Sequence, residues 1–325
     1  MKVSLRFLGL TLAASVVLLA QQGTLSGPVA GFVFDHAAHA LRPIQGVPGA
    51  SLLGDSMSFG FDVAAVYVAP RQDSAIVVGA DQSLHLFSLA GAAPAEVSLE
   101  GISGAPDRVV FSPSGTAVAL MSKASTRILT GLPSSPELTG SIKAPARLID
   151  SGARIQSVRQ PSFALSDDGT FALTVADGSV RLLSVQGQNR SLMPALPTAE
   201  LAFAPGGHDA AVMDRNSGLT LIRNTSATAA SQVLAAPDEG LANPVGVAFS
   251  QDGSTIYVAS AKAQSVAAFK LADASRTTVA CGCTPSTIAP MGNLFRLTEM
   301  TAGPLWLLDG TRATPRTVFV PARSE

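Results

Sequence analysis

The chain has 325 residues, of which 47% are hydrophobic and only 14% are charged, and its formal net charge is −1. This length and apolar content are sufficient for a sizeable core. A nearly neutral chain in which no Lys or Arg adjoins another has no electrostatic basis for binding DNA or RNA, so we expect no nucleic-acid partner.

The first predicted element is a leader. Lys2 and Arg6 form a short positive region before an apolar run over residues 7–20. This run of about 14 residues is too short to span a bilayer comfortably. This pattern predicts a signal peptide over residues 1–20 and an exported product, periplasmic or secreted. Leu18 would occupy the third position before the cleavage site and is larger than that position prefers, so an uncleaved leader that anchors the protein is the alternative. No other segment approaches the length of a membrane span.

After a short linker, residues 21–28, the next predicted element is a strand pair with the sequences VAGFVFD (29–35) and ALRPI (40–44). The pair is similar to the last two strands of the C-terminal sequence LWLLDGTRATPRTVFVP (305–321). We therefore expect it to supply the third and fourth strands of an incomplete repeat.

From residue 60 onward the chain repeats. Short alternating strands bounded by Gly, Pro, Asp and Ser recur with a period of about 44 residues, four strands to a repeat. The first strands of the six repeats are expected to end at Val68, Phe111, Leu165, Phe203, Phe249 and Ile288. This period and strand count are typical of β-propeller blades. We predict an all-β, seven-bladed propeller over residues 29–325; a six-bladed ring with an extra N-terminal hairpin is the alternative.

The best-formed repeat is Pro244–Cys281, with the sequence VAFSQDGSTIYVAS at its centre. It resembles the blades of bacterial YVTN-type propellers, a family that also resembles lactonase-like and surface-layer propellers. Ser250, Asp252, Gly253 and Tyr257 fit the repeat pattern. These positions encode turns and core contacts, so the resemblance implies the fold and leaves the activity open.

Most of the tight turns between first and second strands contain a glycine. We predict that the turn glycines occupy equivalent turns of successive blades, several of them at positive φ, where glycine is favoured. They are Gly115, Gly169, Gly207 and Gly253.

Two short motifs could in principle carry chemistry. Gly54-Asp55-Ser56 resembles the nucleophile block of GDS-type esterases, but the last histidine of the chain is His208 and no late D-x-x-H follows it. His36 and His39 form an H-x-x-H, yet a metal site needs further ligands and only one Asp lies nearby. We therefore interpret both motifs as loops, and we predict no catalytic residue, no metal and no cofactor.

The two cysteines, Cys281 and Cys283, form a C-x-C pair. In an exported protein two thiols normally form a disulfide, so we predict a local bridge at the end of a fourth strand. A redox pair, a metal-ligand pair or an attachment point for a partner are the alternatives.

Propeller ligands usually bind where the blades converge at one end of the central channel. We expect this end to be the face at which the first strands begin and the second strands turn into the third. Its candidate rim residues are Asp107, Arg108, Lys123, Arg154, Arg159, Asp177, Asp214, Arg215 and Asn243. Arg154 and Arg159 belong to a long basic, amphipathic connection, residues 143–160, which is expected either to cap the channel mouth or to cover a blade edge.

The rim residues mix positive and negative charges and include no cluster of acidic residues. This composition favours a non-enzymatic, exported, monomeric propeller that presents loops to a protein or cell-envelope partner. A lactonase-like small-molecule hydrolase on the same fold is the first alternative. A redox or cofactor protein that uses Cys281 and Cys283 is the second.

Overall fold

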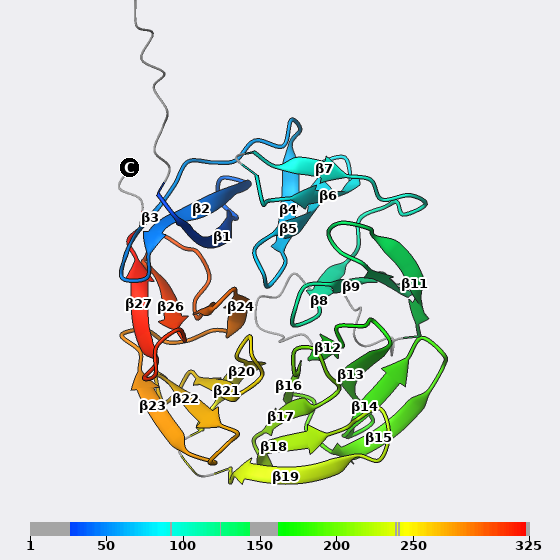
Figure 1. The fold of residues 1–325 in the computed structure, drawn as a ribbon, viewed down its shortest axis with the longest axis vertical. Coiled ribbons are helices and arrows are strands. Elements are labelled where there is room, and N and C mark those ends of the chain that lie inside the picture. Colours follow the sequence, from blue (N-terminus) through cyan, green and yellow to red (C-terminus); the bar gives the residue numbers. More distant parts are fainter. Residues whose placement is uncertain are drawn as a thin grey trace, which may run out of the picture.

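The computed structural model describes residues 27–322 apart from residues 92, 124, 144–161, 238 and 240. In this part of the chain the regular elements are all strands, and they form seven sheets arranged in a ring (Figure 1). No helix in it is long and apolar enough to cross a membrane. The predicted seven-bladed β-propeller is confirmed, and the six-bladed alternative is wrong.

Six of the sheets are complete blades of four antiparallel strands. Blade 2 contains β4 (Val63–Val68), β5 (Ser74–Gly79), β6 (Leu84–Ser88) and β7 (Ala95–Val97). Blade 3 contains β8 (Arg108–Phe111), β9 (Ala117–Met121), β10 (Thr126–Thr130) and β11 (Glu137–Ile142). Blade 4 contains β12 (Phe163–Leu165), β13 (Phe171–Ala176), β14 (Ser179–Ser184) and β15 (Asn189–Pro194). Blade 5 contains β16 (Glu200–Phe203), β17 (Ala210–Asp214), β18 (Gly218–Arg223) and β19 (Ala230–Ala235). Blade 6 contains β20 (Pro244–Phe249), β21 (Thr255–Ser260), β22 (Ser265–Lys270) and β23 (Arg276–Ala280). Blade 7 contains β24 (Ala289–Met291), β25 (Leu294–Arg296), β26 (Leu305–Asp309) and β27 (Arg316–Val320).

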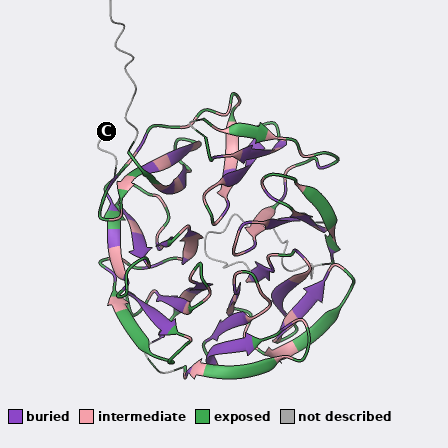
Figure 2. Ribbon diagram, viewed as in Figure 1, coloured by how far each residue is buried: buried purple, intermediate pink, exposed green. Residues whose placement is uncertain are grey.

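The core lies between neighbouring blades rather than within any one of them. The second strands are the most buried, and β5 and β9 are buried at every position because both of their faces contact adjacent sheets, whereas the outer strands are largely exposed (Figure 2). One cluster joins Met213 and Leu221 of blade 5 to Val247 and Phe269 of blade 6. Strands buried on both faces require near-continuous apolar sequence, which explains the runs AIVVG and AVALM.

The turns between first and second strands share one construction. In blades 3, 4 and 6 the turn is opened by a serine whose hydroxyl accepts a hydrogen bond from the amide five residues later, as Ser250 does from Thr255 at 2.9 Å. The turn then closes through Gly253, which has φ of +70°, a conformation that glycine adopts without strain. Gly115 and Gly169 have φ of +72° and +68° in the equivalent turns, as predicted.

Two predicted positions are wrong. In blade 5 the residue at positive φ is Gly206 rather than Gly207. In blade 7 the first strand ends at Met291, three residues after Ile288. Met291 pairs directly with Leu294, so the turn has only two residues, and the strand extends further before it reverses.

Blade 1 has three strands, β1 (Val29–Asp35), β2 (Ala40–Val47) and β3 (Ala50–Leu53). The end of β1 lies beside Asp62 and Ala80, at the face where the first strands of the other blades begin. Its start lies at the opposite face, because a Cβ on Gly31 would be 2.7 Å from Met291. β1 therefore runs opposite to the six first strands.

Because β1 runs in this direction, it corresponds to the second strand of a complete blade. The third and fourth strands then correspond to β2 and β3. β3 accordingly lies on the outer rim next to β27 (Figure 1). The prediction that the hairpin supplies third and fourth strands is wrong, because the additional strand, Ala50–Leu53, has only four residues and lacks a clear alternating pattern. The position of the first strand in blade 1 is not filled by any described strand.

The ring closes between blades 7 and 1. Arg316, at the start of β27, donates from Nη2 to the main-chain oxygen of Pro48 at 3.0 Å and from Nε to Asp309 at 3.1 Å. The Asp309 side chain is only 2% exposed. Burial opposes its ionisation, but hydrogen bonds from Thr311 and Arg316 outweigh this effect and lower the pKa of Asp309 below its ordinary value.

Replacing Asp309 with asparagine is expected to reduce the free energy of unfolding at pH 7 by about 1–2 kcal/mol, because Arg316 loses its charged partner. A lowered pKa stabilises the fold above the pKa of the unfolded state, and this stabilisation is lost as the pH falls through the folded pKa. The difference between wild type and Asp309→Asn, measured by urea unfolding, should therefore shrink from pH 7 to acid pH. A difference that is independent of pH would contradict this interpretation.

Candidate functional site

The seven blades converge on a central channel. We call the end at which the first strands begin the mouth face, and the end with the first-to-second-strand turns the turn face. Near the turn face lies an apolar cavity of about 190 Å³. Its wall is formed by aromatic ends of first strands and by turn prolines, namely Phe111, Phe163, Phe203, Phe249, Pro70, Pro113, Pro205 and Pro290.

A second and larger hollow lies beside blade 1. We call it the blade-1 groove; its volume is about 740 Å³, and it is bounded by β1, β4, β8 and β24. The walls include the apolar side chains of Phe32, Phe34, Val66 and Met291. The groove therefore occupies the position that the first strand of blade 1 would fill.

Both ends of the blade-1 groove are polar. Gln72 lies at the turn-face end, where its Oε1 accepts a hydrogen bond from the main-chain amide of Phe32 at 2.7 Å. Arg296 and Glu299, which form an ion pair, line the mouth-face end together with His36. An occupant would thus meet apolar walls along its length and hydrogen-bonding groups at its ends.

The mouth face also carries several of the rim residues expected from the sequence, and some of them are held in place by one another. Asp107 accepts a hydrogen bond from the main-chain amide of Lys123 at 3.1 Å. Arg215 donates to the side-chain oxygen of Asn243, which links blade 5 to blade 6. These contacts fix the directions of side chains that would otherwise be free in solvent.

Arg108 begins β8 and is half-buried. Burial lowers the pKa of the Arg108 guanidinium, and the nearby carboxylate of Glu200, at the start of β16, partly opposes this shift. The two side chains come from blades 3 and 5, so the structure brings them together from both sides of blade 4. Arg108 stays charged at any physiological pH because an arginine pKa is so high.

Asp214 has a different position from the one expected. Asp214 is 1% exposed, and its carboxylate accepts hydrogen bonds from the amides of Leu196 and Asn216, both at 2.6 Å. It connects blades 4 and 5 and does not face the channel mouth. Asp177 is exposed at the turn between β13 and β14, with φ of +50°. Arg154 and Arg159, with nearly all of the 143–160 connection, lie outside the described residues.

Sequence reasoning missed Gln72, Arg296 and Glu299. No motif includes them, and each belongs to a different turn or loop of blades 2 and 7. The one available signal was Gln72, which stands where blades 3, 4 and 6 have a turn glycine and has φ of +64°. A non-glycine residue at that angle is uncommon and indicates a side chain with a specific contact.

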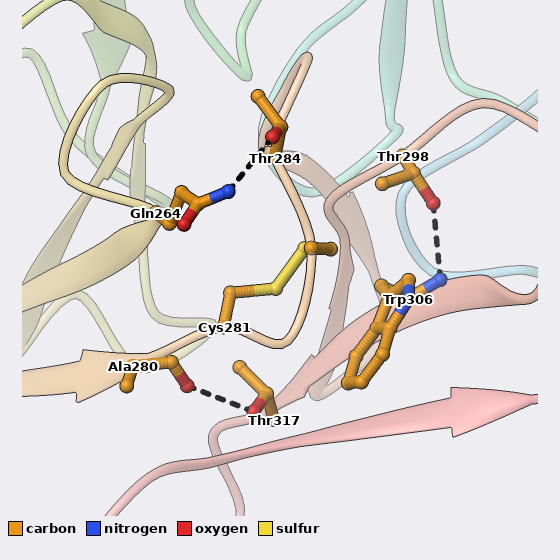
Figure 3. The surroundings of a disulfide bond; sticks show 8 residues. Gln264, Ala280, Cys281, Thr284, Thr298, Trp306 and Thr317 are labelled. Atoms are coloured by element: carbon orange, nitrogen blue, oxygen red, sulfur yellow. Dashed lines mark hydrogen bonds between the residues drawn. A yellow bond between two sulfur atoms is a disulfide. The ribbon is translucent and has the colours of Figure 1, made fainter.

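Cys281 and Cys283 are joined by a disulfide at the crossover from blade 6 to blade 7 (Figure 3). Cys281 is buried, and Trp306 of β26 belongs to the same apolar cluster, with its ring against Gly282 between the two cysteines. The amide of Cys281 donates to the main-chain oxygen of Gln264 at 2.8 Å, and Thr317 donates to that of Ala280 at 3.0 Å.

The two short motifs singled out from the sequence lie near blade 1. The amide of Gly54 donates to Pro43, so the G-D-S stretch continues the pairing of β3 with β2. His36 and His39 are exposed in the turn after β1. In the described part of the chain no group of three or more His, Cys, Asp or Glu side chains is arranged to hold a metal ion.

The fold resembles that of solved structures. One is a functionally unknown protein from Desulfotomaculum acetoxidans DSM 771, with 14% identity and a TM-score of 0.54 over 90% of this chain and 100% of that one. Another is a protein from Lactobacillus plantarum, with 14% identity and a TM-score of 0.53 over 90% of this chain and 96% of that one. No protein-family model and no curated protein matches the sequence. At this identity the comparisons show that the chain has the β-propeller fold, and they show the fold alone.

Proposed function

We propose that this protein is an exported, non-enzymatic β-propeller that binds a protein or cell-envelope partner at its mouth face. The observation that carries the proposal is the combination of the blade-1 groove, which reaches the mouth face at His36, Arg296 and Glu299, with a mouth-face rim of side chains held by one another. Apolar centres with ordered polar rims are typical of protein interfaces. Hydrogen bonds such as Arg215 to Asn243 reduce the entropy that the rim would lose on binding.

Export is supported by the N-terminal leader pattern, and the resemblance of the Pro244–Cys281 repeat to YVTN-type blades is consistent with an envelope protein. The rim mixes positive and negative groups, so the partner surface is expected to be of mixed charge. Binding should therefore depend only weakly on salt, unlike binding to a polyanion.

Site-specific photo-crosslinking tests the proposal. A photoreactive p-benzoylphenylalanine is placed at Lys123, which is exposed on the mouth face, and in a matched variant at Gln251, which is exposed on the turn face. In cells of the source organism, we expect a discrete protein adduct from position 123 and none from position 251. The adduct is identified by mass spectrometry.

Equal labelling from both positions, or no adduct from either, would overturn the proposal. Turnover of a panel of lactones by the purified protein, abolished by Arg108→Ala, would favour the hydrolase alternative instead.

A further inference from the structure

We infer that the blade-1 groove is an acceptor site for one extended peptide strand, supplied by the partner protein, which completes blade 1 by pairing with β1. The inference rests on the proposed function, because it specifies how the partner is held.

Among the described strands β1 pairs with β2 alone, so its other side is an edge of the described sheet. The main-chain oxygens of Leu41 and Pro43 in β2 accept hydrogen bonds from Met57 and Gly54, on the side away from β1. Phe34 and Phe32 are the β1 residues opposite Leu41 and Pro43. In an antiparallel pair these residues direct their own main-chain groups away from β2, toward the groove.

Gln72 provides independent support for this geometry. Its Oε1 accepts the hydrogen bond of the Phe32 amide, in the position of a neighbouring strand's carbonyl oxygen. Toward the mouth face, the main-chain groups of Phe34 have no described strand beside them. Exposed donors and acceptors at strand spacing form a template for another strand.

The shape of the groove limits the occupant. The residues next to β2 that line it are Phe32, Val33 and Phe34, with His36 beyond them, and this span matches about four residues of an extended strand. Ala289 and Met291 lie on one side and Val66 and Val68 on the other. Alternate side chains of the occupant would therefore contact apolar walls, and small or β-branched residues such as Ala and Val fit this environment.

The direction of the occupant follows from the ring. A strand antiparallel to β1 would run from the mouth face to the turn face, parallel to the first strands of the other six blades. Its N-terminal end would lie near His36 and the Arg296–Glu299 pair. The occupant is therefore an extended partner segment of Ala- and Val-rich character that enters from the mouth face.

The probe is a synthetic peptide with the sequence of β20, Pro244–Phe249, acetylated and followed by two lysines for solubility. β20 is the first strand of blade 6 and already has the required shape. We expect the peptide to slow hydrogen exchange of the Phe34 amide by about tenfold or more. The same peptide with N-methylated amides on the pairing edge should have no effect.

Two tryptophan variants locate the site. Ala289→Trp fills the groove and should abolish the protection of Phe34, whereas Ala202→Trp, a matched substitution on the first strand of blade 5 that lines only the apolar cavity, should preserve it. Each variant is first checked by far-UV circular dichroism and thermal unfolding. If Ala289→Trp does not fold, the N-methylated peptide provides the decision by itself.

Three results would overturn the inference: protection that survives N-methylation, protection that survives Ala289→Trp in a folded protein, or a Phe34 amide that is already as protected as that of Val33 without peptide. The last result would mean that a segment of the chain itself occupies the groove. A protein adduct from position 123 together with any of these three results would contradict only the strand-acceptor inference and would leave the proposed function standing.

Discussion

Replacing Gly169 with valine is expected to destabilise the propeller by about 4 kcal/mol, through two separate effects. Gly169 has φ of +68°, which a β-branched residue adopts only with strain. It also lies against blade 3, where a Cβ would be 2.5 Å from Cγ2 of Thr130 and 3.0 Å from Cγ2 of Ile128. Blades 3 and 4 would have to separate to admit the side chain.

Gly253→Val is the matched control. Gly253 has φ of +70° in the equivalent turn of blade 6, but the only atom within 4 Å of its Cβ position is Cδ of Pro205 at 3.9 Å. This variant should lose only the strain contribution, about 1–3 kcal/mol. Urea unfolding of both proteins measures the difference, and equal losses would show that blade packing at Gly169 adjusts without cost.

Replacing Asp167 with alanine is expected to cost about 3 kcal/mol, because one carboxylate joins three blades. Asp167 lies in the first turn of blade 4. Its Oδ1 accepts the amide of Ser114 in blade 3 at 2.7 Å, and its Oδ2 accepts the amide of Gly206 in blade 5 at 2.6 Å. Alanine leaves both amides without this partner at the centre of the turn face.

The control for Asp167 is Asp252 of blade 6. The Asp252 carboxylate accepts hydrogen bonds only within its own turn, from Ser250 and Ser254. Asp252→Ala should therefore cost clearly less than Asp167→Ala in urea unfolding. Asp167→Asn retains one acceptor oxygen and should give an intermediate loss. If Asp167→Ala and Asp252→Ala lose the same free energy, the contacts between blades contribute nothing beyond the turn.

The repeat architecture could be predicted from the sequence because each blade is specified locally. Turn signals such as Ser250-Gln251-Asp252-Gly253 and short alternating runs such as TIYVAS recur at the blade period. Each depends on interactions within about ten residues, which sequence patterns record directly. The same locality explains why Gly115, Gly169 and Gly253 were placed correctly.

The candidate site was predicted only in part. The sequence placed the candidate residues on one rim, but nothing in it indicated which of them would meet. In the structure Arg215 pairs with Asn243, and Arg108 lies near Glu200. Asp214 belonged to the same predicted rim and is instead buried between blades. Its direction depends on amides of the preceding blade.

The sequence by itself thus determined an all-β ring of four-stranded repeats, together with the turns that join first and second strands, since both follow from short-range periodicity and turn chemistry. Only the tertiary structure decided that β1 is a second strand, that no described strand takes the first-strand position of blade 1, and that a groove lies there. Those features depend on contacts such as Gln72 with Phe32 and Arg316 with Pro48, which are 40 and 268 residues apart. Closing a ring brings together the two ends of a long sequence, and no local pattern encodes which strand will lie at the seam.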